Sequence, residues 1–230
     1  SVFAGEASTI SGNLNVGTGT RTFNVLRGLV NPVDLEIDAV VSGSATIVKE
    51  GGGTMELAAN NIFTGPVTIN AGTLCATGQL PLGSVAGGTT INAGAELAVC
   101  SGMVVREPLS FAGTGTPGKL SMLFCYSFYS WEADIALVSD ALIDVADDLV
   151  SLRLSGVISG AGGFTKTGEG VLYLSSANTY AGATRVHAGL LKLEALDGGP
   201  SVPGDLFIGD GVGDLEADVV FVVAESQISD

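Results

Sequence analysis

Apolar and polar residues alternate in short runs along this chain, and glycines separate the runs. Residues 45–48 (Ala-Thr-Ile-Val), 54–57, 66–69 and 171–174 follow this pattern, with β-branched residues at several positions. Runs this short cannot form stable helices, and a period of two residues is typical of strands with one buried face. The sequence therefore predicts an all-β protein built from many short strands.

The runs recur with a period in the low twenties. Residues 68–72 (Thr-Ile-Asn-Ala-Gly) return unchanged as residues 90–94, 22 positions later. This step predicts two ladders of stacked apolar side chains: Ile47, Ile69 and Ile91 in the first half, and Phe164, Val186 and Ile208 in the second. A glycine-punctuated period of this length indicates a solenoid with one coil per period.

A longer repeat has an offset of 117 residues without gaps and relates two regions, about 35–117 and 152–230. The matching pairs are mostly glycines, small residues and apolar residues: Ser42-Gly43 and Ser159-Gly160, Lys49 and Lys166, Leu57 and Leu174, Asn61 and Asn178, Gly65 and Gly182, and Ala71-Gly72 and Ala188-Gly189. A repeat that preserves turns and core residues preserves a shape. It favours a structural or binding surface over catalysis.

Together these periods predict a right-handed parallel β-helix of about ten coils, each of roughly 22–25 residues. We expect residues 1–230 to form one continuous segment, because each coil buries its apolar side only against its neighbours. The 34 glycines, about twice the usual share, supply the corners. Because the chain begins at Ser1 and ends in mid-pattern, we expect it to be a fragment of a longer protein.

The net charge of −15 comes from 24 acidic and 9 basic residues. Nucleic acid is therefore not an expected partner, because phosphate binding requires clustered Lys and Arg. No run of 18 apolar residues exists, so we expect no membrane-spanning segment. The acidic surface is consistent with keeping a long β-rod soluble.

Two acidic segments are candidates for calcium binding: Asp140 with Asp144, Asp147 and Asp148, and residues 209–214 (Gly-Asp-Gly-Val-Gly-Asp). Calcium needs six to eight converging oxygens, and the counterpart of the second segment in the first repeat, which begins Asn92-Ala93-Gly94, has no pair of aspartates. We therefore favour solvated carboxylates and predict neither a metal nor a cofactor.

Three cysteines, Cys75, Cys100 and Cys125, lie 25 residues apart. This spacing places them on one face of successive coils, either as a column of buried thiols or with a Cys75–Cys100 disulfide. We favour buried thiols. The odd number and the absence of a CxxC pattern argue against zinc.

Catalysis has little support, and we predict no enzyme. The only histidine, His187, occupies the corner position that Asn70 holds in the first repeat. Arg153 and Arg185 do not share a coil period, and Glu194, Asp197 and Asp205 cannot be placed relative to one another. Enzymes with this fold need converging carboxylates, and we expect none in this segment.

The aromatic residues concentrate in one segment, with five of them between Phe124 and Trp131. Alternation puts Phe124, Tyr126 and Phe128 on one face, and Tyr129 and Trp131 on the other. They form either an inward stack, which we favour, or an exposed strip that contacts a sugar or a protein. If the segment binds a partner, we expect Tyr126, Tyr129 and Trp131 to make the contact.

Residues 157–182 (Val-Ile-Ser-Gly-Ala-Gly-Gly-Phe-Thr-Lys-Thr-Gly-Glu-Gly-Val-Leu-Tyr-Leu-Ser-Ser-Ala-Asn-Thr-Tyr-Ala-Gly), continued to Leu191, resemble the autotransporter-associated β-strand repeat, also called the passenger-associated transport repeat. A more diverged copy runs from Val41 to Leu74. The resemblance implies the passenger region of a large bacterial surface or secreted protein, folded as a parallel β-helix and exported by a type V route.

We therefore expect a non-catalytic stalk or adhesin segment, exported to the bacterial cell surface or the extracellular space. Its partners would be a glycan or protein of a host or neighbouring cell, or further copies of itself. Two other functions stay open: a carbohydrate-binding or carbohydrate-processing β-helix, and a self-associating surface filament. A groove with two converging carboxylates would favour carbohydrate processing, whereas smooth sides would favour a spacer.

Overall fold

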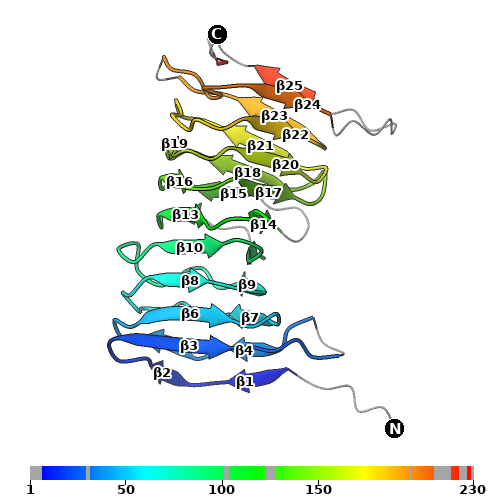
Figure 1. Cartoon of the computed structure of the whole chain (residues 1–230). Coiled ribbons are helices and arrows are strands. Elements are labelled where there is room, and N and C mark those ends of the chain that lie inside the picture. Colours follow the sequence, from blue (N-terminus) through cyan, green and yellow to red (C-terminus); the bar gives the residue numbers. More distant parts are fainter. Residues whose placement is uncertain are drawn as a thin grey trace.

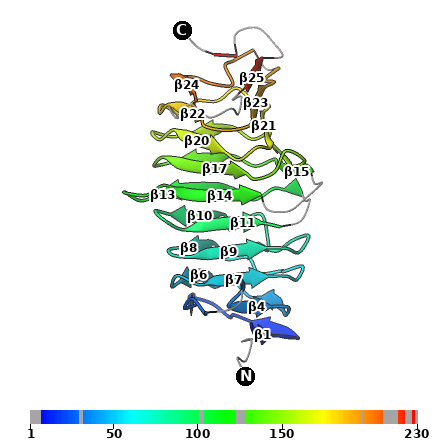
Figure 2. The same ribbon diagram turned by 90° about the vertical axis from the view of Figure 1, so that its right-hand side faces the viewer.

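The computed structural model describes residues 7–29, 32–100, 104–122, 128–196, 198–209, 219–222 and 227–228. Within these ranges the chain forms 25 short strands and no helix. Successive coils stack from the N-terminal to the C-terminal end, so that the molecule is an elongated solenoid (Figure 1, Figure 2). All paired strands are parallel, which confirms the predicted parallel β-solenoid.

The strands fall into four sheets. The ten-stranded sheet contains β1 (Ser8–Ile10), β4 (Leu35–Ile37), β7 (Thr54–Leu57), β9 (Thr73–Ala76), β11 (Glu96–Val99), β14 (Gly118–Met122), β17 (Ala141–Val145), β20 (Phe164–Thr167), β22 (Thr184–Val186) and β24 (Leu206–Ile208). The seven-stranded sheet contains β3 (Thr20–Asn24), β6 (Thr46–Glu50), β8 (Val67–Ile69), β10 (Thr89–Asn92), β13 (Leu109–Ala112), β16 (Ile135–Leu137) and β19 (Ile158–Ser159). The six-stranded sheet contains β12 (Val104–Val105), β15 (Phe128–Trp131), β18 (Ser151–Leu154), β21 (Val171–Leu174), β23 (Leu190–Leu193) and β25 (Val219–Val222). A fourth sheet pairs β2 (Asn13–Asn15) with β5 (Val40–Ser42).

The coils vary more in length than the sequence period suggests. Thr54 pairs with Thr73 in the next coil, a step shorter than any predicted coil. Ser8 pairs with Leu35, a step longer than any predicted coil. The predicted range of coil lengths is therefore too narrow, because the loops between strands absorb insertions without changing the ladder. The predicted ten coils match the ten strands of the longest sheet, but the solenoid makes only about eight complete turns.

The register of the predicted ladders is partly correct. Ile69 pairs with Ile91, as expected, but Ile47 pairs with Val67, and Lys49 takes the position opposite Ile69. The same shift in the second half pairs Phe164 with Thr184, and Lys166 with Val186. In both cases the intervening coil is shorter than the predicted step. The shift places a lysine in each inward-facing ladder.

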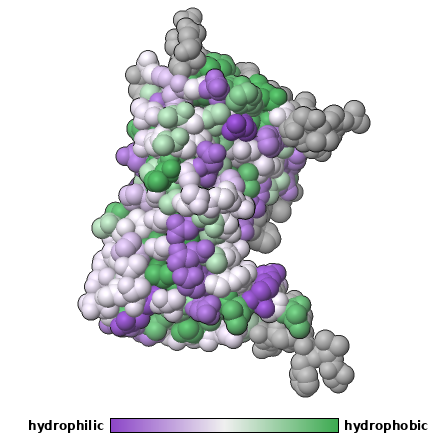
Figure 3. All heavy atoms as spheres, in the orientation of Figure 1, coloured by the Kyte–Doolittle hydropathy of each residue, from purple (hydrophilic) through white to green (hydrophobic). Residues whose placement is uncertain are grey.

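The core runs along the axis of the solenoid and consists of side chains that alternate inward along the strands. Its largest members include Trp131, Tyr129, Tyr180, Phe111 and Phe164. Hydrophilic and hydrophobic residues are mixed on the side shown in Figure 3. In the described part of the chain, no helix is long and apolar enough to cross a membrane.

Lys49 and Lys166 are fully buried, and each bonds three backbone carbonyls at a corner. The Lys49 Nζ donates to the carbonyls of Glu50, Gly51 and Ala71 at 2.8–3.0 Å. The Lys166 Nζ donates to the equivalent carbonyls of Thr167, Gly168 and Ala188 at 2.6–3.2 Å. A buried ammonium is tolerated when hydrogen bonds replace its hydration. The aliphatic stem packs in the core, and the ammonium donates to corner carbonyls, of which that of Glu50 also accepts the Val25 N–H at 2.9 Å.

Asn61 and Asn178 form a second repeated corner. The Asn61 Oδ1 accepts the Val41 N–H at 2.8 Å, and its Nδ2 donates to the Pro81 carbonyl at 2.7 Å. Asn178 repeats this with the Ile158 N–H at 2.8 Å and the Ser201 carbonyl at 2.7 Å. Each amide therefore links three successive coils where the loop lacks strand pairing.

The two copies of the long repeat face different sides of the solenoid. β6, with Lys49, belongs to the seven-stranded sheet, whereas β20, with Lys166, belongs to the ten-stranded sheet. Ile158 is the fifth successive partner of Ile47 along the seven-stranded sheet, and Phe164, the counterpart of Ile47, lies beyond the next corner. One repeat thus equals five coils plus one side. The repeat therefore preserves the buried corner. A repeated binding surface would have to lie on the same side of the solenoid in both copies, and these copies lie on different sides.

Candidate functional site

The aromatic segment forms part of the core at β15. Phe128 is 53% exposed, whereas Tyr129 and Trp131 are 2% and 1% exposed. The Trp131 Nε1 donates to the Glu107 carbonyl at 3.0 Å, which satisfies the buried indole. The favoured inward stack thus agrees with the burial of these two rings. As contact residues Tyr129 and Trp131 are unsuitable, because neither ring has a face free for a partner; Tyr126 lies outside the described residues.

A group of charged and aromatic side chains, in which Phe128 is exposed and the others are half-buried, lies on the outer face of the six-stranded sheet. We call it the aromatic–cation patch; it comprises Phe128, Arg153, Tyr173, Lys192 and Glu194. Arg153, Tyr173 and Lys192 occupy one row, because β18, β21 and β23 pair with these residues in register. The parallel ladder therefore brings together residues from three successive coils.

The Arg153 guanidinium is the centre of this patch. Its Cζ lies 4.6 Å from the centroid of the Tyr173 ring and 5.8 Å from that of Phe128. The Nη1 atom donates to the Ser175 hydroxyl and to the Glu194 Oε2, both at 2.6 Å. Stacking and a charge-assisted hydrogen bond together fix the guanidinium plane.

Lys192 approaches the same tyrosine. Its Nζ lies 5.0 Å from the Tyr173 ring centroid and 3.4 Å from the phenol oxygen. The Phe128 and Tyr173 ring centroids are 6.4 Å apart at an interplanar angle of 58°. The patch therefore presents an exposed ring beside two cations on neighbouring strands and a carboxylate that directly follows β23. Such a surface can stack on the C–H face of a sugar and hydrogen-bond its hydroxyls or acidic groups.

Phe128 was placed in the aromatic segment by the sequence, but Arg153, Tyr173, Lys192 and Glu194 were not combined with it. On sequence alone, Glu194 is a candidate carboxylate and Arg153 a candidate basic residue, and nothing places them together. The signal that joins them is the outward position on successive coils, which requires the strand register.

The calcium candidates do not converge. The Asp144 carboxylate accepts from Lys119 at 3.0 Å and from the Thr167 hydroxyl at 2.9 Å. Asp140 accepts the Gly163 N–H, and Asp147 accepts the Leu149 N–H. Among the residues that the structure describes, no three His, Cys, Asp or Glu side chains are grouped as a metal site requires; most of residues 209–214 lie outside them.

Cys75 and Cys100 are free thiols in this structure, Cys75 buried and Cys100 half-buried. Cys75 pairs with Ala98 across β9 and β11, so that Cys100 is its diagonal neighbour. A hydrogen bond with Cys100, together with burial, raises the pKa of Cys75. The protonated thiol is thus favoured at this position; Cys125 lies outside the described residues.

His187 lies at a corner, as its alignment with Asn70 predicted. Its backbone N–H donates to the Lys166 carbonyl at 2.9 Å, just as the backbone N–H of Asn70 donates to the Lys49 carbonyl. Asp205 uses its carbonyl to accept the Thr184 N–H, and Asp197 lies outside the described residues. Arg185 stacks over Phe207 at 5.2 Å from the ring centroid.

Comparisons with known proteins match both repeated corners, and the second match also includes Tyr173 and Lys192 of the patch. The family model described as passenger-associated-transport-repeat matches residues 47–74 and 164–193. Each matched segment contains one buried lysine and one corner asparagine, and the resemblance noted in the sequence is confirmed for both. One relative is the Adhesin BmaC autotransporter of Brucella suis biovar 1 (strain 1330), 29% identical over 192 residues. The match covers 80% of this chain but only 5% of that protein. No solved structure matches the chain.

Proposed function

We propose that this chain, which carries two passenger-associated transport repeats, is a non-catalytic section of a large exported bacterial surface protein and forms a rod with adhesive contacts. The observation that carries the proposal is the identity of the repeated polar residues. Lys49, Lys166, Asn61 and Asn178 are buried and bond backbone groups at corners. Because both repeated lysines are fully buried, they stabilise the coil and cannot contact a ligand at the surface.

The similarity to a protein named as an adhesin supports the same function. That relative is about twenty times longer than the matched region, since the match covers 5% of it. The rod would then hold contact surfaces at a distance from the cell, on the bacterial surface or in the extracellular space.

We assign the contact surface to the aromatic–cation patch, with a glycan or a protein of a host or neighbouring cell as partner. Phe128 supplies an exposed ring, and Arg153 and Lys192 supply donors to hydroxyl or carboxylate groups. A carbohydrate-binding segment is the second candidate function, and the ring beside two cations is the feature that favours it. Catalysis is not part of the proposal, because the Glu194 carboxylate is engaged by Arg153 at 2.6 Å.

A double substitution, Phe128→Ala with Lys192→Ala, tests this surface. We expect at least tenfold weaker binding in glycan-array and whole-cell assays, because the exposed ring and one cation are lost. The matched control is Phe207→Ala, which removes another half-exposed ring that lies over an arginine. Equal binding by the double variant, or no binding by the unmodified chain, would reduce the segment to a spacer.

A further inference from the structure

A cavity opens where the six-stranded sheet begins. β12 is the first strand of that sheet, and on this side the preceding coil contributes residues 77–88, which contain no strand. The resulting gap has a volume of about 110 Å³ and is lined mainly by aliphatic side chains: Leu80, Leu82, Val85, Val104 and Val105. This volume equals about four water molecules, so it fits a short alkyl chain.

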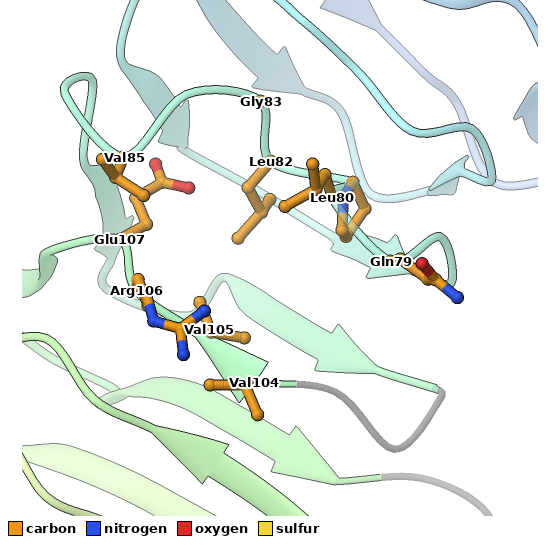
Figure 4. A pocket seen from close by; sticks show the side chains of 10 residues that line it. Gln79, Leu80, Leu82, Gly83, Val85, Val104, Val105, Arg106 and Glu107 are labelled. Carbon is orange, nitrogen blue, oxygen red and sulfur yellow. The ribbon is translucent and has the colours of Figure 1, made fainter.

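Glu107 is the one buried carboxyl in the described lining, and it is only 3% exposed. Its Oε1 accepts the Thr89 hydroxyl at 2.9 Å. Within the described part of the chain, Oε2 has no hydrogen-bond partner. The backbone of Glu107 is held by the Trp131 indole, which donates to its carbonyl. Figure 4 shows its carboxyl on the Val85 side of the opening, with Leu82 and Leu80 opposite.

Among the residues that the structure describes, none supplies a counter-cation to the Glu107 carboxyl. Burial raises the pKa of Glu107 to about 7, opposed only by the Thr89 hydrogen bond. Arg106, the neighbouring cation, is 64% exposed and bonds Glu132 through its Nε at 2.8 Å. In Figure 4 its guanidinium is directed away from Glu107, toward Val105. A buried carboxyl beside an empty apolar space is complementary to a cation with an aliphatic stem.

We propose that this cavity binds a primary alkylammonium group, with the alkyl chain against Leu80, Leu82 and Val85 and the ammonium at Glu107. The chemistry is that of a lysine side chain of a partner protein or of a small free amine. The fold already holds such groups internally, because Lys49 and Lys166 bury their stems and bond oxygen atoms through Nζ. The net charge of −15 attracts cations to the surface. This site lies outside the aromatic–cation patch and does not depend on it.

Binding of n-butylammonium, followed by chemical shifts of the backbone amides, tests the site. We expect saturable shifts at residues around the cavity, and at least tenfold weaker binding by Glu107→Gln at pH 8. The glutamine side chain retains the shape and the acceptor for Thr89, and circular dichroism checks the fold. Glu36→Gln, which removes a carboxylate from β4, is the matched control and keeps the wild-type affinity. Equal affinity for n-butanol and n-butylammonium would overturn the proposal, since it would show an apolar hole without charge recognition.

The pH dependence gives a second test that requires no variant. The affinity of the unmodified chain should rise about tenfold from pH 6 to pH 8, because the ionised fraction of a group titrating near pH 7 rises from about one-tenth to about nine-tenths. An affinity that does not change with pH contradicts the proposal. Nα-acetyl-lysine amide distinguishes the two sources: binding comparable to n-butylammonium assigns the site to lysine side chains, and binding of the free amine alone assigns it to small amines.

Discussion

Replacing Lys166 with methionine is expected to destabilise the solenoid by about 3 kcal/mol, and Lys49→Met by a similar amount. Methionine retains most of the apolar stem but removes the ammonium donor from three corner carbonyls, and at Lys49 that of Glu50 keeps another donor, the Val25 N–H. For Lys166 these belong to Thr167, Gly168 and Ala188. Losing the buried partner of a polar group costs about 1–3 kcal/mol per group, and methionine recovers part of this by packing. Urea unfolding monitored by circular dichroism measures the change.

Lys119→Met is the matched control. Lys119 is 31% exposed and bridges Glu96 and Asp144 on the outer face of the ten-stranded sheet. Ion pairs of this kind contribute about 1 kcal/mol or less, so a smaller loss is expected. The loss at the two buried corners should also add in the double variant, because the sites lie several coils apart and share no contact. A cost at Lys166 no greater than that at Lys119 would show that the corner carbonyls find other donors.

These corners also show what the sequence predicts and where it stops. Short alternating runs and the recurring glycines predict the parallel solenoid, because strand period and corner conformation are local properties. The long repeat pairs Lys49 with Lys166, but the sequence does not place either lysine in the core; the structure shows that both are buried. Lysine is seldom fully buried, so residue type alone would place both on the surface.

The candidate surface could not be assembled in the same way. Arg153, Tyr173 and Lys192 meet because two successive coils are both shorter than the sequence period. Coil length varies widely in this chain, as the pairs Thr54–Thr73 and Ser8–Leu35 show, and a loop insertion leaves no periodic trace in the sequence. Outward neighbours on successive coils therefore depend on loop lengths that only the structure provides. The same shift moved Lys49 into the position that the period assigned to Ile47.

Tyr129 and Trp131 illustrate a related limit. Alternation separated Phe128 from Tyr129 and Trp131, and the structure agrees, with Phe128 outward and the other two inward. The pattern does not reveal which of the two faces is the buried one when both contain aromatic residues. In the structure the Trp131 face is the buried one, and the indole N–H is satisfied there by the Glu107 carbonyl on the preceding coil.

Stability is expected to fall by about 3 kcal/mol as the pH rises from about 4.5 to about 7, because of Glu107 alone. In the unfolded chain its carboxyl ionises near the ordinary pKa of 4.5, whereas burial raises the pKa in the folded state to about 7. Between these values the folded state retains a proton that the unfolded state has lost, so each pH unit removes about 1.4 kcal/mol. Below pH 4.5 the protonated Glu107 makes its full contribution to the free energy of unfolding, and above pH 7 that contribution is lost.

Glu107→Gln isolates this contribution from that of the other carboxylates. The amide does not titrate, so the difference in unfolding free energy between variant and wild type should change by about 3 kcal/mol between pH 4.5 and pH 8. At pH 8 the variant should be the more stable protein, because it no longer buries a charge without a counter-ion. Urea unfolding at several pH values measures both curves. If they run parallel, Glu107 ionises in the folded chain near its ordinary pKa, and its carboxylate must be hydrated through the cavity.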